Sequence, residues 1–216
     1  MTGTATQNSI FQGFTKEDFD VFGLEGLPAR MAGIQNRIQP KFRAIGELMI
    51  HDMTEMTGQE MHLHVAKHLR RTVNPPKDTW LAFAHNKRGY KAHPHFQIGL
   101  FDDHAFLWLA LIYELPNKSA IASSYLARLD ELMDTVPPDY MLSLDHTKSD
   151  ALRTGDLTKQ EWKESLVRFR DVQKAELLIG RRIDAGDPLL QDGENFLAYA
   201  IDTFNTLMPW YKLAMA

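Results

Sequence analysis

The sequence predicts a single α+β domain, with a mainly antiparallel sheet of five or six strands and helices packed against it. Short apolar segments bounded by turn residues alternate with amphipathic segments that carry helix-start patterns. The 216 residues are 44% hydrophobic, enough for one substantial core, and no linker or internal repeat divides them. We therefore expect a frayed N-terminus over residues 1–13 and one domain over residues 14–216.

Two helices are expected first. Residues 15–18 have the form of a capping box with Phe14 before it, which predicts a short helix over about 16–21. Pro28 suits the first turn of a longer helix, in which apolar residues recur every three or four positions as far as Met56. Pro40 falls inside this pattern and should kink or split the helix, and Gly58 should end it.

Strands dominate the next part of the chain. Residues 61–65 and 79–85 read as strands, separated by a turn at 74–78 that contains two prolines. Residues 95–101 and 105–114 predict a hairpin. The second of these strands is almost wholly apolar, so we expect it in the middle of the sheet, covered on both faces.

Helices and strands alternate through the remaining residues. A helix is expected from about 117 to 133, a strand over 140–144, and a helix from a second capping box at 158–161 to about 172. The last strand is expected over 175–183. A final helix should begin at Asp192 or Gly193 and carry apolar residues on one side as far as Tyr211.

Composition excludes several classes of site. The chain contains no cysteine, so disulfides, thiolate zinc sites, iron–sulfur clusters and cysteine nucleophiles are excluded. This fits a reducing compartment. No run of 18 apolar residues predicts a membrane span, and the first ten residues lack the features of a signal peptide. We expect a cytoplasmic protein.

Four motifs carry a family resemblance: HVAKHLRRTVNPPKDTW at 64–80, NKRGYKAHPHFQIGL at 86–100, IYELPNK at 112–118 and LDHTK at 144–148. They resemble the YktB-like family of uncharacterised bacterial proteins, over about residues 14–213. The resemblance implies a single α+β domain in a cytosolic protein of low-GC Gram-positive bacteria. The family is a domain of unknown function, so the resemblance implies no catalytic residue.

Residues 60–97 are unusually basic. They hold seven Lys or Arg against two acids, a balance of +5, and six of the nine histidines, whereas the whole chain carries −4. A basic segment in an acidic chain indicates a place where an anion binds. The negative total argues against a non-specific coat on nucleic acid but permits a local site.

Two H-x-H patterns, His62 with His64 and His93 with His95, leave several roles open. His95 and His64 are candidate general acids or bases acting on a phosphate-like group. Four converging imidazoles would also suit zinc, nickel or copper, but no carboxylate accompanies either pair, and we assign no metal site. The alternative is that each histidine is satisfied by a neighbouring strand or helix.

Side-chain alternation refines the role of His95. In a strand over 95–101, His95, Gln97 and Gly99 share one face, and the apolar residues between them face the core. Gly99 leaves room there for a ligand or a backbone to approach.

The expected ligand-binding residues are polar groups from several strands and loops. They are Lys67, His68, Arg70, Arg71, Arg88, Lys91, His93, Gln97, His146, Lys148 and Arg181. The adjacent Arg70 and Arg71 can hold phosphate or carboxylate through paired hydrogen bonds. A solvated surface, or ion pairs with the acidic remainder of the chain, is the alternative.

Three functions remain open. The first is binding of an anionic ligand such as a nucleotide, a phosphorylated metabolite or RNA, with Trp80 or Tyr90 available to stack on a base. The second is a phosphoester-acting enzyme with a histidine general acid or base. The third is a protein-interaction scaffold that meets an acidic partner through the basic segment. No particular cofactor is indicated.

Overall fold

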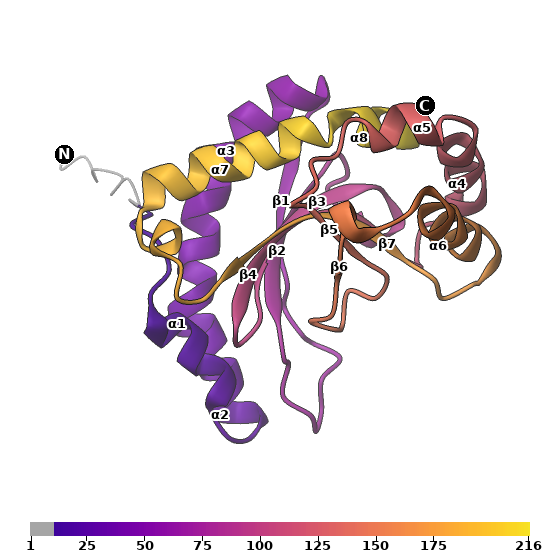
Figure 1. Ribbon diagram of the computed structural model, residues 1–216. Coiled ribbons are helices and arrows are strands. Elements are labelled where there is room, and N and C mark those ends of the chain that lie inside the picture. The colour runs from indigo at the N-terminus through magenta and orange to yellow at the C-terminus, as the bar shows by residue number, and fades with distance from the viewer. Residues whose placement is uncertain (1–10) are drawn as a thin grey trace.

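The computed structural model describes residues 11–216 as a twisted antiparallel sheet with helices against one face (Figure 1). Among the described residues the sheet has seven strands, in the spatial order β1-β2-β3-β4-β7-β5-β6, and all neighbouring strands are antiparallel. The strands are β1 His62–Val65, β2 Thr79–Ala84, β3 His95–Leu100, β4 His104–Leu111, β5 Met141–Ser143, β6 Leu152–Arg153 and β7 Leu177–Asp184.

The expected number of five or six strands was too low by one, because β6 was missed. This edge strand has two residues, both exposed, and pairs with β5 through Leu142 and Leu152. Two exposed residues give no alternation of apolar and polar side chains, so no pattern marks the strand. The expectation for β4 is confirmed, since all its residues are buried and it pairs with β3 and β7.

Eight α-helices lie within the described residues. They are α1 Lys16–Asp20, α2 Leu27–Gly33, α3 Gln39–Thr57, α4 Lys118–Ala127, α5 Leu129–Met133, α6 Lys159–Asp171, α7 Gly193–Thr206 and α8 Met208–Met215. Figure 1 shows α3 and α7 lying across the same face of the sheet. Helices α4, α5, α6 and α8 gather at the end of the molecule away from α1 and α2. None of these helices is both long enough and apolar enough to cross a membrane.

Three expected helices are interrupted. Directly before Pro40, where we expected a kink or a split, a π-helical segment over Ile34–Ile38 joins α2 to α3 without leaving helical backbone, and Pro40 lies in the first turn of α3. The last helix breaks at Leu207, where Pro209 favours a new helix start. The break between α4 and α5 falls at Arg128, which has φ −121° and ψ 24°.

The two faces of the sheet differ in what covers them. Helices pack over Phe96, Ile98 and Leu100 in the main core, as the alternation predicts. A smaller apolar cluster on the other face contains Trp80 and Phe106. Gly99 does face this side, but the room it leaves is filled by the Phe106 ring, since a Cβ at Gly99 would lie 2.1 Å from Phe106 Cζ.

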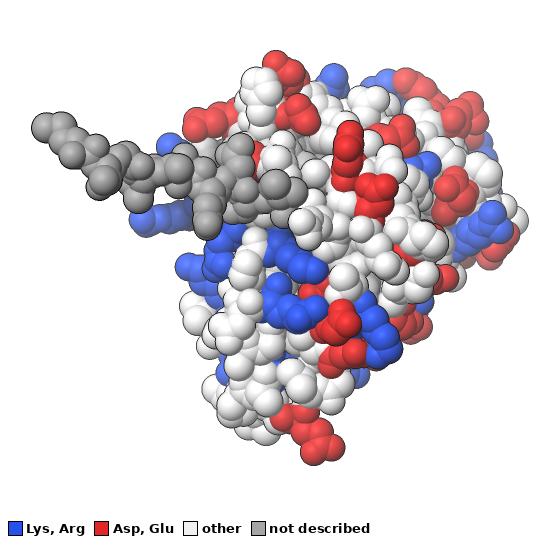
Figure 2. All heavy atoms as spheres, turned by 90° about the vertical axis from the view of Figure 1, so that its left-hand side faces the viewer, with Lys and Arg blue, Asp and Glu red and all other residues white. Residues whose placement is uncertain are grey.

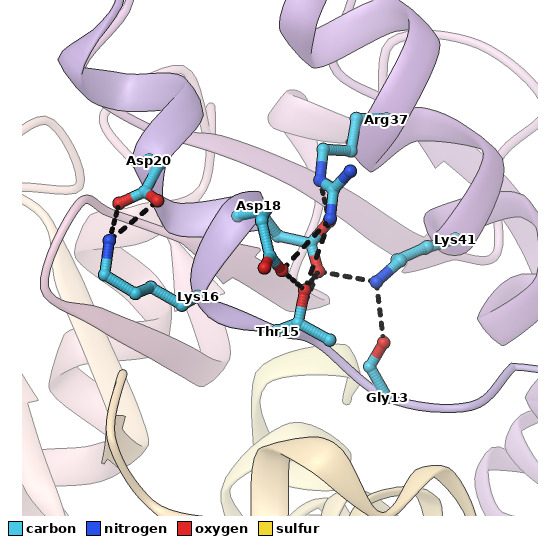
Figure 3. Close-up of polar contacts among 8 residues, drawn as sticks. Gly13, Thr15, Lys16, Asp18, Asp20, Arg37 and Lys41 are labelled. Carbon is cyan, nitrogen blue, oxygen red and sulfur yellow. Dashed lines mark hydrogen bonds and ion pairs between the residues drawn. The ribbon is translucent and has the colours of Figure 1, made fainter.

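Asp18 fastens the N-terminal segment to α3 (Figure 3). Its carboxylate is fully buried, lies 3.0 Å from Arg37 Nε and accepts a hydrogen bond from Lys41. Lys41 also donates to the Gly13 carbonyl at 2.8 Å. Figure 2 shows this side of the molecule, where a band of Lys and Arg side chains borders Asp and Glu side chains.

The packed chain begins earlier than residue 14, where we expected the domain to start. Phe11 is 6% exposed and its ring lies 5.1 Å from that of Phe14 and 5.6 Å from that of Phe196. Residues 1–10, the rest of the expected frayed segment, lie outside the described residues.

Candidate functional site

A pocket of about 340 Å³ opens beside the smaller apolar cluster, on the face of the sheet opposite α3 and α7. Its walls come from the connection between β1 and β2, the start of β2, a short 3-10 turn over Tyr90–Ala92, and the loop after β5. We call it the cationic pocket. Its ionisable lining residues are Lys67, His68, Arg70, Arg71, Asp78, Tyr90, Lys91, Glu114 and His146.

The connection between β1 and β2 cannot continue the sheet because Pro75 and Pro76 lack amide hydrogens. It therefore leaves the strand at Ala66 and carries Arg70 and Arg71, both exposed, to the pocket rim. His68 adopts φ +51°, the one non-glycine residue with positive φ among the described residues. Such strained backbone is common at functional sites.

His68 contributes a neutral ring to the pocket. Its Nε2 lies 3.1 Å from Thr79 Oγ1, and its ring meets the Trp80 ring edge-on at 5.7 Å. Burial lowers the pKa of His68 to about 4, and the positive charges of Arg71 and Lys91 act in the same direction. His68 is therefore uncharged at neutral pH.

Asp78 lies at the start of β2 and is 4% exposed. Burial raises its pKa to about 6, and the opposing charges of His146, Arg71 and Lys91 offset only part of this effect. Within residues 11–216, no ion pair or side-chain hydrogen bond joins Asp78 to another side chain. A buried carboxyl that titrates near neutral pH in a pocket is typical of functional sites.

His146 is held from behind by Glu176, the residue just before β7. The Glu176 carboxylate accepts the His146 backbone amide at 2.7 Å and its Nδ1 at 2.8 Å. Glu176 is 3% exposed and also accepts the Tyr113 amide at 3.4 Å. Because Nδ1 is committed to Glu176, Nε2 is the ring nitrogen of His146 that remains free to meet a ligand.

The same loop holds the one group of possible metal ligands found in the described part of the chain. Ligand atoms of Asp145, His146 and Glu176 lie within 4.8 Å of one another. The Glu176 oxygens already accept hydrogen bonds from His146, and Lys148 Nζ lies 3.7 Å from the Asp145 carboxylate. These contacts account for the cluster without an ion. The paired H-x-H histidines form no such group among residues 11–216.

Two further hollows border the cationic pocket. A hollow of about 520 Å³ shares His146 and Thr147 with it and reaches Tyr113 and Leu152. Another, of about 690 Å³, includes Thr147, Lys148 and Arg30. Thr147 therefore lines all three.

The structure brings six of the expected ligand-binding residues together at the cationic pocket. They are Lys67, His68, Arg70, Arg71, Lys91 and His146. Lys148 lines the two neighbouring hollows, and Arg88 is exposed in the loop before Tyr90.

The candidate catalytic histidines lie outside the pocket. His95 is fully buried, with Nδ1 donating to the His93 carbonyl at 2.8 Å and Nε2 accepting from Gln97 at 2.8 Å. His64 stacks on Tyr90 at 4.8 Å, and its Nε2 lies 2.7 Å from the Asn86 carbonyl. These contacts match the alternative in which each histidine is satisfied by neighbouring residues of the fold.

Arg181 points to the opposite face of the sheet. Its guanidinium lies 4.5 Å from the ring centres of Tyr140 and Tyr199 and 2.9 Å from the Asp202 carboxylate on α7. A neighbouring strand residue, Arg182, pairs with Asp103 at 2.7 Å. Neither lines the cationic pocket.

Sequence reasoning missed Asp78 and Glu176 as site residues. Asp78 was read only as part of a turn, although it directly precedes an apolar strand. Glu176 stands alone inside an apolar run, between Ala175 and Leu177. A single acid next to or within a buried strand is the pattern that could have identified both, because such an acid needs a partner or a function.

Comparison with known proteins places this geometry in a family. Residues 14–211 match the sequence model of a domain of unknown function, DUF1054. The chain belongs to this family. The DUF1054 match spans nearly all of the described fold, and the expected resemblance to the uncharacterised YktB-like proteins is confirmed.

Relatives extend the family match over nearly the whole chain. The UPF0637 protein of Oceanobacillus iheyensis is 57% identical over 203 residues, which cover 94% of this chain and 97% of the relative. That of Shouchella clausii is 50% identical over 203 residues, covering 94% and 95%. That of Exiguobacterium sibiricum is 49% identical over 199 residues, covering 92% and 96%.

Proposed function

We propose that the cationic pocket binds a phosphate-bearing anion, such as a nucleotide or the end of an RNA strand. One observation carries the proposal: Lys67, Arg70, Arg71 and Lys91 line one pocket, and none of them forms an ion pair within residues 11–216. Arg88 and Lys174, outside the pocket, also lack an ion pair among the described residues, so it is the gathering of four cations around one pocket that favours an anion.

The charge balance favours an anion. Lys67, Arg70, Arg71 and Lys91 share the pocket with only two acids, Asp78 and Glu114. Two adjacent guanidiniums can hold phosphate through paired hydrogen bonds, and Lys91 adds a point charge. The volume of the cationic pocket, about 340 Å³, lies in the range of small-molecule sites.

Aromatic side chains form the apolar part of the wall. Trp80 donates from Nε1 to the Tyr90 hydroxyl at 2.9 Å, and Lys91 Nζ lies 5.2 Å from the Trp80 ring centre. These contacts give the wall a fixed shape beside the cations. A planar organic group attached to the phosphate would pack here.

A concave site favours a small ligand over a protein partner. The scaffold function would require the cations to meet an acidic surface, but the same pocket also includes Asp78, which is 4% exposed, and His146, whose side chain is 11% exposed. A cytoplasmic location, consistent with the absence of cysteine, is part of this proposal.

Calorimetric titration with pyrophosphate, nucleoside mono-, di- and triphosphates and a short single-stranded RNA tests the proposal. The double variant Arg70→Ala/Arg71→Ala should weaken binding by at least about tenfold, because hydrogen bonds to charged groups contribute about 1.5–3 kcal/mol each. It should also reduce the dependence of affinity on salt concentration.

Lys87→Ala/Arg88→Ala is the matched control. It also removes two positive charges, from exposed positions of the same basic segment that do not line the pocket. Equal affinity and salt dependence in the wild type and in Arg70→Ala/Arg71→Ala would place the site elsewhere. If Arg70→Ala/Arg71→Ala loses binding of RNA alone, the ligand is a nucleic acid. If it loses binding of every probe, the phosphate is the group recognised.

A further inference from the structure

We propose that the cationic pocket is also a catalytic site for hydrolysis of a phosphate ester, with Asp78 as general base and His146 as general acid. This inference rests on the proposed function, because Arg70, Arg71 and Lys91 must hold the phosphoryl group. It assigns the chemistry to residues other than His95 and His64. Both ring nitrogens of His95 are engaged, and His64 Nε2 meets the Asn86 carbonyl, away from the pocket.

Asp78 has the environment that a general base requires. Its carboxyl lines the pocket, is 4% exposed, and has no partner side chain among residues 11–216 to hold it in a structural ion pair. No partner side chain offsets the cost of burying this carboxylate, so its presence needs an explanation. Burial raises the pKa of Asp78 to about 6, which leaves it mostly ionised at neutral pH yet basic enough to accept a proton.

His146 has the support that a general acid requires. Glu176 accepts Nδ1 at 2.8 Å and fixes both the orientation of the ring and the nitrogen that faces the pocket. The backbone amide of His146 donates to the same carboxylate at 2.7 Å, so the ring cannot turn away from Glu176 without breaking a second contact.

The proposed step balances as follows in atoms and charge. A water oxygen attacks phosphorus while Asp78 takes one of its protons. The bond between phosphorus and the ester oxygen breaks, and that oxygen takes the Nε2 proton of His146. The products are the phosphate and the free alcohol. Exchange with solvent then returns the proton from Asp78 to the medium and reprotonates His146, so one water molecule is consumed in each turnover.

Arg70, Arg71 and Lys91 would stabilise the charge that spreads over the equatorial oxygens in the transition state. Asp78 directly precedes β2, and His146 belongs to the loop after β5. Both side chains line the same pocket. Residues from separate elements thus supply the base and the acid.

Leaving-group dependence is the test that a purely structural role would not pass. His146→Gln should slow hydrolysis of a nucleoside monophosphate by about 100-fold or more, because its alkoxide leaving group needs a proton. Hydrolysis of p-nitrophenyl phosphate should be much less affected, since p-nitrophenolate leaves without one. Asp78→Asn should slow both substrates by about 100-fold. Bis-p-nitrophenyl phosphate, assayed in parallel, distinguishes a diester from a monoester substrate.

Binding measurements keep the two proposals separate. Pyrophosphate binding should persist in Asp78→Asn and His146→Gln, and circular dichroism should show that both variants are folded. Pyrophosphate binding without turnover of any ester would overturn the catalytic proposal and leave the binding proposal intact. Absence of both would overturn both. An equal effect of His146→Gln on the two leaving groups would overturn the assignment of His146 as the acid. Lys87→Ala, at an exposed position outside the pocket, should turn over at the wild-type rate.

Discussion

Glu176 contacts His146 twice, accepting its backbone amide at 2.7 Å and its ring Nδ1 at 2.8 Å. The two residues are 30 positions apart in the chain, one in the loop after β5 and the other just before β7. This pairing fixes the loop against the sheet and places an imidazole in the wall of the cationic pocket. Glu176, which belongs to no catalytic sequence motif, therefore sets the orientation of the His146 ring, the proposed general acid.

Glu176→Gln should loosen the loop. Gln retains the shape but lacks the charge that strengthens these hydrogen bonds, a difference of about 1–2 kcal/mol. Amide hydrogen exchange at His146 should become about tenfold faster. Glu114→Gln, in the same pocket wall, is the control because Glu114 makes no ion pair within residues 11–216. Unchanged exchange in Glu176→Gln would contradict the role assigned to this contact.

Asp78 should make the fold less stable as pH rises. Burial raises its pKa from 3.8 to about 6, so the folded state binds the proton more tightly than the unfolded state. The free energy of unfolding should therefore fall between about pH 4 and pH 6 and stay lower above that, by up to about 3 kcal/mol.

Asp78→Asn should remove this loss. Urea unfolding should show a larger free energy of unfolding for the variant at pH 7.5 and no difference at pH 4. The exposed Asp52→Asn controls for the general effect of removing one negative charge. A stability gain that is equal at both pH values would rule out titration of Asp78 as its source.

Asp18 and Asp20 should differ sharply in importance, although they are two residues apart (Figure 3). Asp18 is fully buried against Arg37 and Lys41, so Asp18→Ala should lower the free energy of unfolding by about 3 kcal/mol. Asp20 makes only an exposed pair with Lys16, so Asp20→Ala should cost about 0.5 kcal/mol or less. Chemical denaturation of both variants measures the difference, and similar losses would be inconsistent with it.

Gly99 and Phe106 should be energetically coupled. A Cβ at Gly99 would lie 2.1 Å from Phe106 Cζ and 2.7 Å from the Thr79 carbonyl oxygen. Gly99→Ala should therefore destabilise by about 1–3 kcal/mol through overpacking. Phe106→Leu shortens the side chain, and the double variant should lose less than the sum of the single losses. Simple additivity in a double-mutant cycle would show that the ring is not the obstacle.

His95 should remain neutral well below its ordinary pKa, because burial lowers the pKa to about 3. Nitrogen-15 spectra at pH 5 should show a proton on Nδ1 and none on Nε2, matching the contacts to the His93 carbonyl and Gln97. On acidification, proton binding by the unfolded state should reduce stability below about pH 6.5. A positively charged ring at pH 5 would contradict this burial.

Local patterns predicted most of the framework. Both capping boxes form: Thr15 donates its amide to Asp18 at 2.7 Å, and Thr158 donates its amide to Glu161 at 2.8 Å. These predictions rest on contacts within one turn of helix, which neighbouring residues decide. The short edge strand β6 was missed because its two exposed residues carry no alternating pattern, and no local sequence pattern marks the break at Arg128.

The candidate site was predictable in its charge but not in its chemistry. Lys67, Arg70, Arg71 and Lys91 are close in sequence and line one pocket, as charge segregation predicts. The Tyr90 side chain separates His64 of β1 and His95 of β3 from these cations. Its ring stacks on His64 at 4.8 Å and meets His95 edge-on at 5.0 Å, so it covers both histidines. The spacing of residues in the sequence does not show where the aromatic side chain of a loop residue such as Tyr90 will pack.

Thr147 borders the cationic pocket and both neighbouring hollows. A ligand that displaces this loop on entering one hollow must change the shape of the other two. Occupancy of the three spaces is then thermodynamically linked. Any molecule that alters the affinity of the pocket for an anion through this loop will have its own affinity altered by the same factor.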